Sequence, residues 1–276
     1  MKNKILFLPL LLLAVACSNS KQDAEDMLST AERHFLSGNY AEATQWIDSI
    51  SAVYPHEVDV IREGMMLQCK VNQMMYEEEL IRVDSLYNVA KAEVEALKPQ
   101  FVLVREGKEQ TLANYVYKGY ESNGAVSKSG LRAQVTEKGD FQLTSIYYGG
   151  SKINHTGISV NGVASKAIAY DGAKNYRYTT GGNAVEMVTY NMAQCREVAD
   201  AIANESGKLA VNYTGGKKYS VTLDGNHRKA IADTYRLACA LAQTDSLQSC
   251  YEYSKLQLEL ADRQLMKLEE QALLEE

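Results

Sequence analysis

The four histidines are the first side chains to test for chemistry, because histidine binds metals and moves protons near neutral pH. His34, His56, His155 and His227 stand far apart, and no two have the spacing of a metal-binding pair on a helix. His155 lies among Gly, Asn and Thr residues, where we expect a solvated loop. The sequence also lacks the strong motifs of serine hydrolases, zinc proteases, nucleotide-binding loops and calcium loops. It therefore predicts no catalytic residue, no metal site and no cofactor.

Clustered carboxylates are the next feature with catalytic potential. Glu77–Glu79 and Glu269–Glu270 fall on predicted helices, where such clusters are typical of solvated faces. A glycosidase needs two carboxyl groups about 5–10 Å apart, and these can come from distant loops without a local motif. A hydrolase acting on cell-wall or dietary glycan therefore stays an alternative.

Tyrosines are concentrated in the middle of the chain, which holds eleven of the eighteen. Tyrosine is enriched at binding surfaces, but it is also a favoured strand residue with a polar tip. The first candidates for a binding site are Tyr147, Tyr148, Tyr176 and Tyr178. The eleven are at positions 115, 117, 120, 147, 148, 170, 176, 178, 190, 213 and 219.

Four cysteines, Cys69, Cys195, Cys239 and Cys250, form no CxxC motif and match no metal-binding spacing. We expect small buried thiols. One long-range disulfide, such as Cys69 with Cys239 or Cys250, is the alternative, because an exported chain can form disulfides.

The N-terminus has the pattern of a secretory signal peptide over residues 1–16, with an apolar run too short to span a bilayer. Its end, Ala14-Val15-Ala16-Cys17, resembles the lipobox of bacterial lipoproteins, although leucine is commoner where Ala14 stands. The resemblance implies that Cys17 becomes the mature N-terminus and carries a diacylglyceryl thioether and an N-acyl chain. Several acyl chains hold a domain durably on a membrane. A secreted protein with a chance cysteine is the alternative.

The residues after Cys17 bear on location. Ser18 resembles the sorting position of lipoproteins sent to the outer membrane, and the acidic run Gln22–Asp26 resembles export signals of surface lipoproteins. The same acidic residues would also suit the first turn of a helix. We therefore expect a lipid-anchored outer-membrane protein, on the periplasmic face or at the cell surface.

Composition and charge exclude some functions. The chain has 276 residues, 46% of them hydrophobic, as in globular proteins. Its net charge of −6 becomes −8 once Lys2 and Lys4 leave with the signal peptide. Without a basic footprint, nucleic acid is not an expected partner.

Glycine marks the domain layout, because sixteen of eighteen glycines lie between Gly107 and Gly225. Pro55 and Pro99 both fall at the ends of helical patterns. We expect an α+β protein in which a helical hairpin and antiparallel coiled-coil-like arms flank an inserted antiparallel β meander or partial barrel. The predicted segments are a signal peptide (1–16), an acidic tether (17–26), helices (27–99), a Gly/Tyr-rich β head (100–225) and a C-terminal stalk helix (226–276).

The first helical segment resembles one tetratricopeptide-repeat helix pair. A second copy is not expected, because Asn72 and Met74 stand where it would need glycine and tyrosine. A plain helical hairpin is the alternative, and a further helix is expected around Val58–Lys70. The resemblance is carried by Ala31, Gly38, Tyr40, Ala43, Ile47, Ile50 and Pro55.

Two later segments have apolar positions stepping alternately by three and four residues, the pattern of a left-handed coiled coil. One runs from Tyr76 to Leu97 and the other from Leu237 to Ala272. Because they flank a single insert, we expect antiparallel neighbours.

The insert is predicted to contain seven to nine strands and a helix over 193–203. Period-two alternation around Gly-containing turns predicts three hairpins. They pair 132–136 with 141–148, 167–170 with 176–179, and 209–213 with 219–223.

From these patterns we expect a non-enzymatic binding or scaffold module. Its expected partners are the membrane, through the lipid anchor, and an envelope protein or glycan, with homo-oligomerisation left open. An outer-membrane assembly factor is a further alternative.

Overall fold

The computed structural model describes residues 20–105, 111–121 and 126–275. Within these residues it is an α+β fold with antiparallel strands, as the sequence predicts. It has five α-helices and ten strands in two sheets of six and four, where the sequence indicated seven to nine strands in one meander or partial barrel. The described strands form two open sheets rather than a barrel. Cys17 and the predicted signal peptide lie outside the described residues. The described residues form two compact units: a helical unit (residues 20–84 and 249–275) and a head (within residues 85–248).

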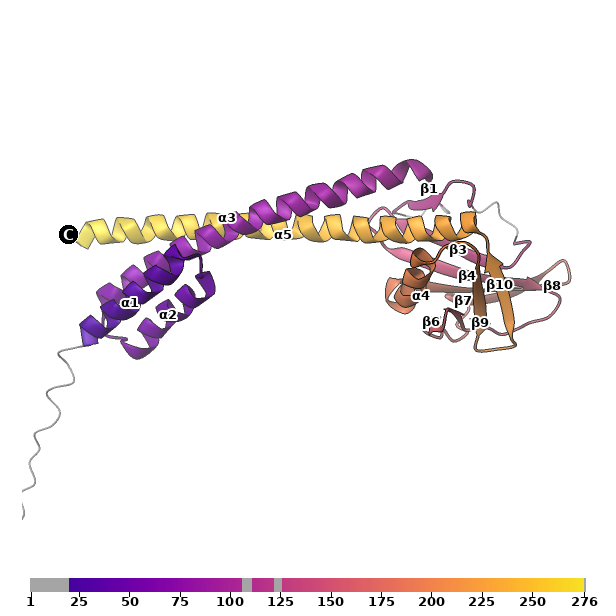
Figure 1. Cartoon of the computed structure of the whole chain (residues 1–276), viewed down its shortest axis with the longest axis horizontal. Coiled ribbons are helices and arrows are strands. Elements are labelled where there is room, and N and C mark those ends of the chain that lie inside the picture. Colours follow the sequence, from indigo (N-terminus) through magenta and orange to yellow (C-terminus); the bar gives the residue numbers. More distant parts are fainter. Residues whose placement is uncertain (1–19, 106–110, 122–125, 276) are drawn as a thin grey trace, which may run out of the picture. The chain divides into compact units, whose positions relative to one another are not determined.

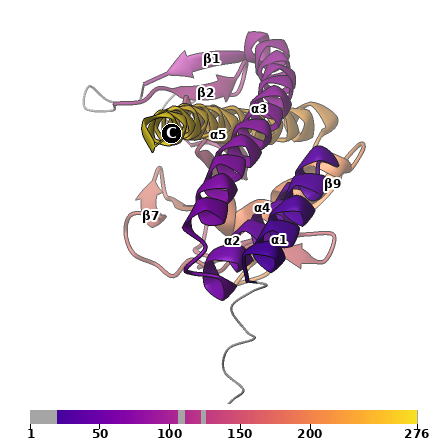
Figure 2. The ribbon, with the colours of Figure 1, turned by 90° about the vertical axis from the view of Figure 1, so that its left-hand side faces the viewer.

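The helical unit starts with a hairpin of α1 (Ser20–Leu36) and α2 (Tyr40–Val53), which lie side by side in Figures 1 and 2. Gly38 takes the positive φ of +74° that the turn between them requires. Small residues, Ala31 and Ala43, are fully buried where the helices meet. Residues 20–26 belong to α1, so this part of the predicted tether is helical.

Helix α3 (Val58–Leu97) is one continuous helix of 40 residues, where the sequence indicated a short helix followed by an arm. Nothing between the two predicted segments breaks the helix. Gly64 lies within it, and a Cβ atom there would make an ordinary van der Waals contact with Ile47 of α2 at 3.5 Å. A 3₁₀ turn, η1 (Lys98–Gln100), follows and includes Pro99.

Helix α5 (Gly225–Glu275) shows the predicted coiled-coil seam in its burial. Between residues 244 and 272 the buried or half-buried positions are those of the predicted seam, together with Gln257. In the helical unit α3 and α5 are antiparallel: Gln73 donates a hydrogen bond to Asp262 (2.7 Å), and the rings of Tyr76 and Tyr253 meet edge to face. The predicted arms are therefore confirmed.

The head contains both sheets. The six-stranded sheet has the order β1-β2-β3-β4-β8-β7, and the four-stranded sheet has the order β10-β9-β5-β6. The strands are β1 (Phe101–Val104), β2 (Asn114–Tyr117), β3 (Gly130–Thr136), β4 (Phe141–Gly149), β5 (Gly157–Val160), β6 (Val163–Ala164), β7 (Asn175–Thr180), β8 (Asn183–Asn191), β9 (Leu209–Thr214) and β10 (Tyr219–Leu223).

Two of the three predicted hairpins are confirmed, β3–β4 and β9–β10. The hairpin pairing 167–170 with 176–179 is wrong, because residues 167–170 form no strand and β7 pairs with β8. The turn of the observed hairpin is Gly181-Gly182, and both glycines have positive φ. A two-residue turn of this kind matches the right-handed twist of the strands.

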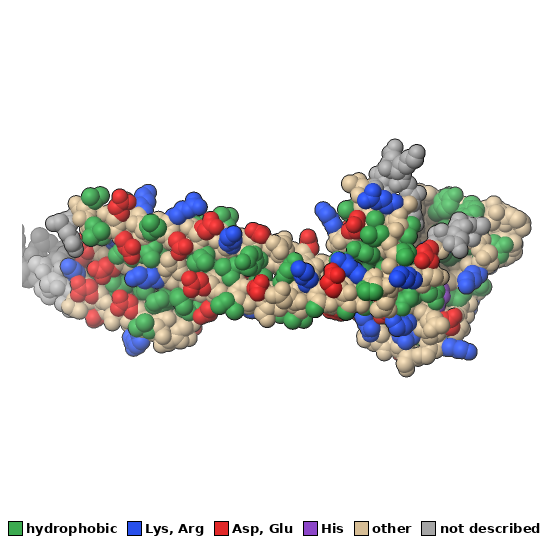
Figure 3. Space-filling view, turned by 90° about the horizontal axis from the view of Figure 1, so that it is seen from above, with side chains coloured by type: hydrophobic (Ala, Val, Ile, Leu, Met, Phe, Trp, Pro, Cys, Tyr) green, Lys and Arg blue, Asp and Glu red, His purple; other side chains and the backbone are tan. Residues whose placement is uncertain are grey.

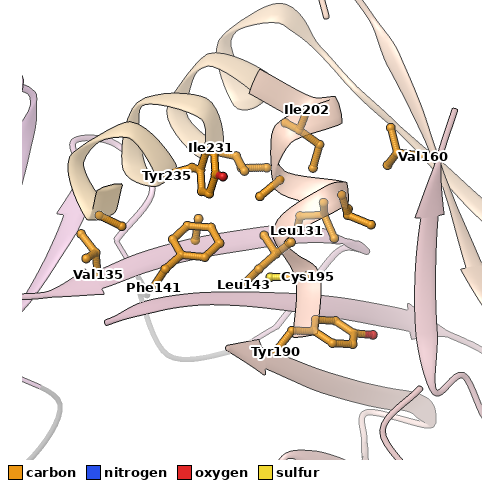
Figure 4. Close-up of a cluster of buried hydrophobic side chains, with 14 of the residues drawn as sticks. Leu131, Val135, Phe141, Leu143, Val160, Tyr190, Cys195, Ile202, Ile231 and Tyr235 are labelled. Carbon is orange, nitrogen blue, oxygen red and sulfur yellow. The ribbon is translucent and has the colours of Figure 1, made fainter. Parts of the chain in front are cut away.

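The core of the head lies between the six-stranded sheet and the helices that cover it, and it includes residues of the four-stranded sheet such as Val160 (Figure 4). The rings of Phe141 on β4 and Tyr235 on α5 meet edge to face at 5.5 Å. Beside them lie Leu143 and two residues of α4 (Met192–Asn204), Cys195 and Ile202. Helix α4 confirms the predicted helix and begins with a capping box between Asn191 and Gln194.

Charge is divided unequally between the units. Residues 20–84 and 249–276 contain 8 Lys and Arg against 20 Asp and Glu, a net charge of −12. Residues 85–248 contain 19 against 15, a net charge of +4. Figure 3 shows the acidic side chains gathered on the helical unit. The modest total charge therefore conceals an acidic unit and a basic head.

Candidate functional site

The head contains a pocket of about 430 Å³, where strands β2 and β3 separate. The two strands pair only at Asn114–Thr136 and Tyr115–Val135, whereas β3 continues beside β4 to Gly130. Its lining comes mainly from residues 117 and 119–121, from residues 126–133 and from the start of α5. This volume suits a small molecule or a short stretch of a larger one.

The pocket combines aromatic walls with polar groups. Tyr117, Tyr120 and His227 supply the rings, and Tyr120 stacks on His227 with 5.0 Å between centroids and a tilt of 30°. Lys128 and Arg132 supply cationic groups. The lining is more polar than that of most small-molecule sites, which are predominantly apolar with a few polar groups.

His227 has a defined tautomer. Its Nε2 lies 2.6 Å from the carbonyl oxygen of Leu131, which can only accept, so Nε2 carries the proton. Burial lowers the pKa of His227, although the Leu131 carbonyl and Asp224 oppose this. At neutral pH the ring is therefore uncharged, with its lone pair on Nδ1.

Two carboxylates, Asp224 and Glu121, line the pocket. Asp224 accepts a hydrogen bond from the backbone N–H of His227 (2.8 Å) at the start of α5, and this lowers the pKa of Asp224. Glu121 accepts from the backbone N–H of Gly119 (2.9 Å). Both carboxylates thus hold the pocket's backbone in place.

The tyrosines selected from the sequence divide between the two faces of the six-stranded sheet. Tyr148 and Tyr178 both pair with Val185 of β8, and Tyr176 pairs with Met187, two positions further along the same strand. Side chains of paired residues point to the same face of a sheet, as do those two positions apart. Tyr148, Tyr176 and Tyr178 therefore share one face, the one away from the helices. Tyr176 is 45% exposed, and its ring centroid is 5.3 Å from that of Tyr178. Three of the four therefore form one aromatic surface.

Tyr147 points to the opposite, inner face. It is 5% exposed, donates a hydrogen bond to the carbonyl of Ser151 (2.7 Å) and packs edge-on against Tyr219. The two-residue alternation of a strand turns Tyr147 and its neighbour Tyr148 to opposite sides. Its role here is to hold the loop after β4.

A Ser–His–Glu series is buried in the head, and sequence reasoning missed it. His155 Nδ1 lies 2.9 Å from Glu186 Oε2, and its Nε2 lies 2.9 Å from Ser145 Oγ. Glu186 also accepts the backbone N–H groups of Ile153, Asn154 and His155 at 2.8–3.0 Å. The three members are 10 and 31 residues apart, so no local motif could have indicated them.

The protonation states within this series follow from burial and hydrogen bonding. Burial alone would raise the pKa of Glu186, but four N–H donors outweigh it and lower that pKa. Burial lowers the pKa of His155, although Glu186 opposes this. A carboxylate therefore faces a neutral imidazole, which accepts the proton of Ser145.

This series resembles a catalytic triad only in its order of groups. Ser145, His155 and Glu186 are all 0% exposed, and Ser145 lies in the middle of β4 between two paired strands. A nucleophile must reach its substrate. We therefore assign the series a structural role, which is to fasten the loop over 153–155 to β8. His155 is accordingly a buried histidine and not the solvated one that the sequence indicated.

The expectation of buried thiols is confirmed for Cys69 and Cys195 and wrong for the other two, because Cys239 is half-buried and Cys250 is exposed on α5. The four cysteines that the structure describes are free thiols, so none of the disulfides considered from the sequence is present. Burial raises the pKa of Cys195 to about 12 and also raises that of Cys69. Such thiols stay protonated and act as small apolar side chains.

The described residues contain no group of three or more His, Cys, Asp or Glu side chains that could hold a metal ion. Within the same residues, no helix combines the length and apolarity needed to cross a membrane. Searches against protein-family models, curated proteins and solved structures found no match to this chain.

Proposed function

We propose that the protein is an envelope lipoprotein, anchored through acyl chains on Cys17, that works as a non-enzymatic binding module. The pocket between β2 and β3 is its ligand site. Anchoring is supported by the lipobox-like sequence that ends in Cys17. Binding is supported by one observation above all: a polar pocket with aromatic walls opens where the β2–β3 ladder ends.

The state of the carboxylates favours binding over glycan hydrolysis. A glycosidase needs a general acid whose pKa is raised, so that it keeps its proton near neutral pH. Asp224 has its pKa lowered by backbone N–H donors. Glu121 and Asp224 do share the pocket, so hydrolysis remains the second candidate.

Fractionation of membranes tests the anchor. The native protein is expected in the membrane pellet after a high-salt wash, with an N-terminal peptide whose mass shows acylated Cys17. A Cys17→Ser variant is expected in the soluble fraction. Release of the native protein by washing without detergent would refute the anchor, as would membrane retention of the variant.

Binding at the pocket can be tested with two classes of envelope compound, short peptides and soluble peptidoglycan fragments. We expect one class to raise the thermal midpoint of the head and to lose this effect in a Tyr120→Ala variant. Tyr176→Ala is the matched control, because it removes an exposed tyrosine outside the pocket. Cleavage of the glycan fragments that stops in Glu121→Gln would instead establish the hydrolase. A compound that acts through Tyr176 and not Tyr120 would move the site to the aromatic surface.

A further inference from the structure

We infer that three basic loops of the head bind an acidic glycan, at a site separate from the pocket. The basic loops are residues 151–156, 166–177 and 214–218. None of these residues lines the pocket, so the inference goes beyond the function proposed for it. The ligand is a polysaccharide segment that carries carboxylate groups on its sugar rings.

The net positive charge of the head is concentrated in the basic loops. They contain six Lys and Arg against a single carboxylate, Asp171. With Glu186, which binds the loop over 153–155, the balance becomes six against two, a net charge of +4. The whole head has the same net charge of +4, so its remaining charges cancel. The six cations are Lys152, Lys166, Lys174, Arg177, Lys217 and Lys218.

The two carboxylates are already engaged by other donors. Asp171 accepts the backbone N–H groups of Ala173 and Asn175, both at 2.9 Å. Glu186 is buried and accepts four N–H groups from residues 153–155. Within the described residues, none of the six cations forms a salt bridge. The loops therefore present positive charge that no carboxylate of the described chain pairs with.

Three of the cations come together at one point of the backbone. Lys152 directly precedes Ile153, whose carbonyl accepts the backbone N–H of Lys217 (2.8 Å). Arg177 donates a hydrogen bond to Oδ1 of the next residue, Asn154 (2.8 Å). Three segments that are distant in sequence thus each bring one cation to the same short loop, where a single extended ligand can contact all of them.

The basic loops are fixed to one another, so their charges are held in place before a ligand arrives. The side chain of Asn175 donates to the carbonyls of His155 (3.3 Å) and Ile168 (2.8 Å). At Gly216 a Cβ atom would overlap the carbonyl oxygen of Ile153, so only glycine permits the β9–β10 turn to approach this closely. A site that is already ordered loses less conformational entropy on binding.

Tyr170 and Arg177 supply the contact that selects a sugar. The Arg177 guanidinium lies over the Tyr170 ring, 5.1 Å from its centroid, and the ring is 60% exposed. The face of an aromatic ring is partly negative, and the C–H groups of a pyranose ring are weakly positive, so an exposed ring held in place suits a sugar face. The same guanidinium can bind a carboxylate of that sugar through a charge-assisted hydrogen bond.

Other polyanions fit this surface less well. Single-stranded nucleic acid stacks successive bases on several aromatic rings along a basic groove. The next exposed ring, that of Tyr176, lies on the opposite face of β7 from Arg177, because neighbouring side chains of a strand alternate. A lipid headgroup would engage the cations and leave Tyr170 unused. The arrangement therefore favours an acidic glycan.

The experiment measures the binding of fluorescein-labelled hexagalacturonate to the full-length protein in a neutral detergent, by fluorescence anisotropy. The methyl ester of the same hexamer is the control ligand, because it keeps the sugar rings and lacks the charges. We expect the acid to bind, and the ester to bind at least tenfold more weakly.

Matched variants locate the contact. A Lys152→Gln/Lys217→Gln double variant is expected to bind the acid about tenfold more weakly, because each exposed ion pair contributes roughly threefold to affinity. Lys138→Gln/Lys208→Gln is the control, because it removes the same charge at two exposed lysines outside the basic loops. Tyr170→Ala is expected to weaken binding about fivefold without changing its salt dependence, because it removes no charge. Near-UV circular dichroism checks that each variant is folded.

Each other outcome overturns the inference. Equal binding of acid and ester would mean that the cations are not used. Equal losses in the two double variants would show general electrostatic attraction and no defined site. Binding of hexathymidylate or phosphatidylglycerol vesicles as tightly as the acid, with no loss in Tyr170→Ala, would assign the loops to nucleic acid or to lipid. No binding of the acid would refute the glycan site and leave the test of the pocket unaffected.

Discussion

The buried carboxylate Glu186 permits a sharp test of how the head is held together. In Glu186→Gln, the amide nitrogen that replaces Oε2 would face two donors, the backbone N–H and Nδ1–H of His155. The imidazole can change tautomer and accept, but the backbone N–H cannot. If the amide is rotated so that its nitrogen replaces Oε1, the result is worse, because that nitrogen would face two backbone N–H donors, those of Ile153 and Asn154.

The magnitude follows from these contacts. One orphaned buried N–H costs about 1–3 kcal/mol, and converting the remaining charge-assisted hydrogen bonds to neutral ones costs about 1 kcal/mol each. With one orphaned N–H and two weakened hydrogen bonds, we expect a loss of about 3–5 kcal/mol. For a unit of this size the thermal midpoint changes by about 2–4 °C per kcal/mol, which gives roughly 6–20 °C.

The assay must report on the head alone. Trp46, the single tryptophan, lies in α2, so its fluorescence follows the helical unit. Near-UV circular dichroism is dominated by tyrosines, thirteen of which lie within residues 85–248. Asp171→Asn is the matched control, because Asp171 also accepts two backbone N–H groups, from Ala173 and Asn175, but is exposed. A Glu186→Gln head within about 1 kcal/mol of the native one would refute the reasoning, as would an equal loss in the control.

Three further predictions concern pH, packing and backbone geometry. The pKa values of His155 and His227 are lowered in the folded head, so the unfolded chain binds protons at a higher pH than the folded one. Denaturation midpoints of the head should therefore fall as the pH drops below about 6.5, and a flat profile from pH 7.5 to 5.5 would contradict this. Ala31→Leu overpacks the α1–α2 contact and should destabilise the helical unit by about 1–3 kcal/mol, measured by Trp46 fluorescence in urea, with exposed Ala41→Leu as the control. Gly139→Ala should lower the thermal midpoint of the head, because φ is +90° and a Cβ would lie 2.8 Å from the backbone nitrogen of Ala242, whereas Gly150→Ala meets no such contact.

Local patterns predicted the parts of the fold that depend on near neighbours in sequence. The seam of α5, including the buried Ser254 and Ala261, could be read because a coiled coil repeats every 3.5 residues whatever it packs against. The wrong hairpin had a similar local basis. Asp171-Gly172 is a plausible turn, but strands are selected by their partners across the sheet, and β8 paired with β7.

The candidate site could not be predicted, because it depends on contacts between distant residues. His227 meets Leu131 across 96 positions, and the pocket exists only because β2 leaves β3 after Tyr115. Tyr117 and Tyr120 were noted among the head tyrosines, but nothing local distinguished them from Tyr147, which is buried. Sequence alternation indicates which face a strand residue takes, and not where a ladder ends.

The insertion of the head between the two arms also bears on how the arms find each other. Residues 85–248 form a loop of 164 residues between the paired segments of the helical unit. Closing an unstructured loop of that length carries an entropy penalty of about 4–5 kcal/mol. The folded head removes most of it, because Val94 of α3 and Leu237 of α5 already share its core. The head therefore acts as an intramolecular cross-link, and the seam of the helical unit should form only after the head has folded.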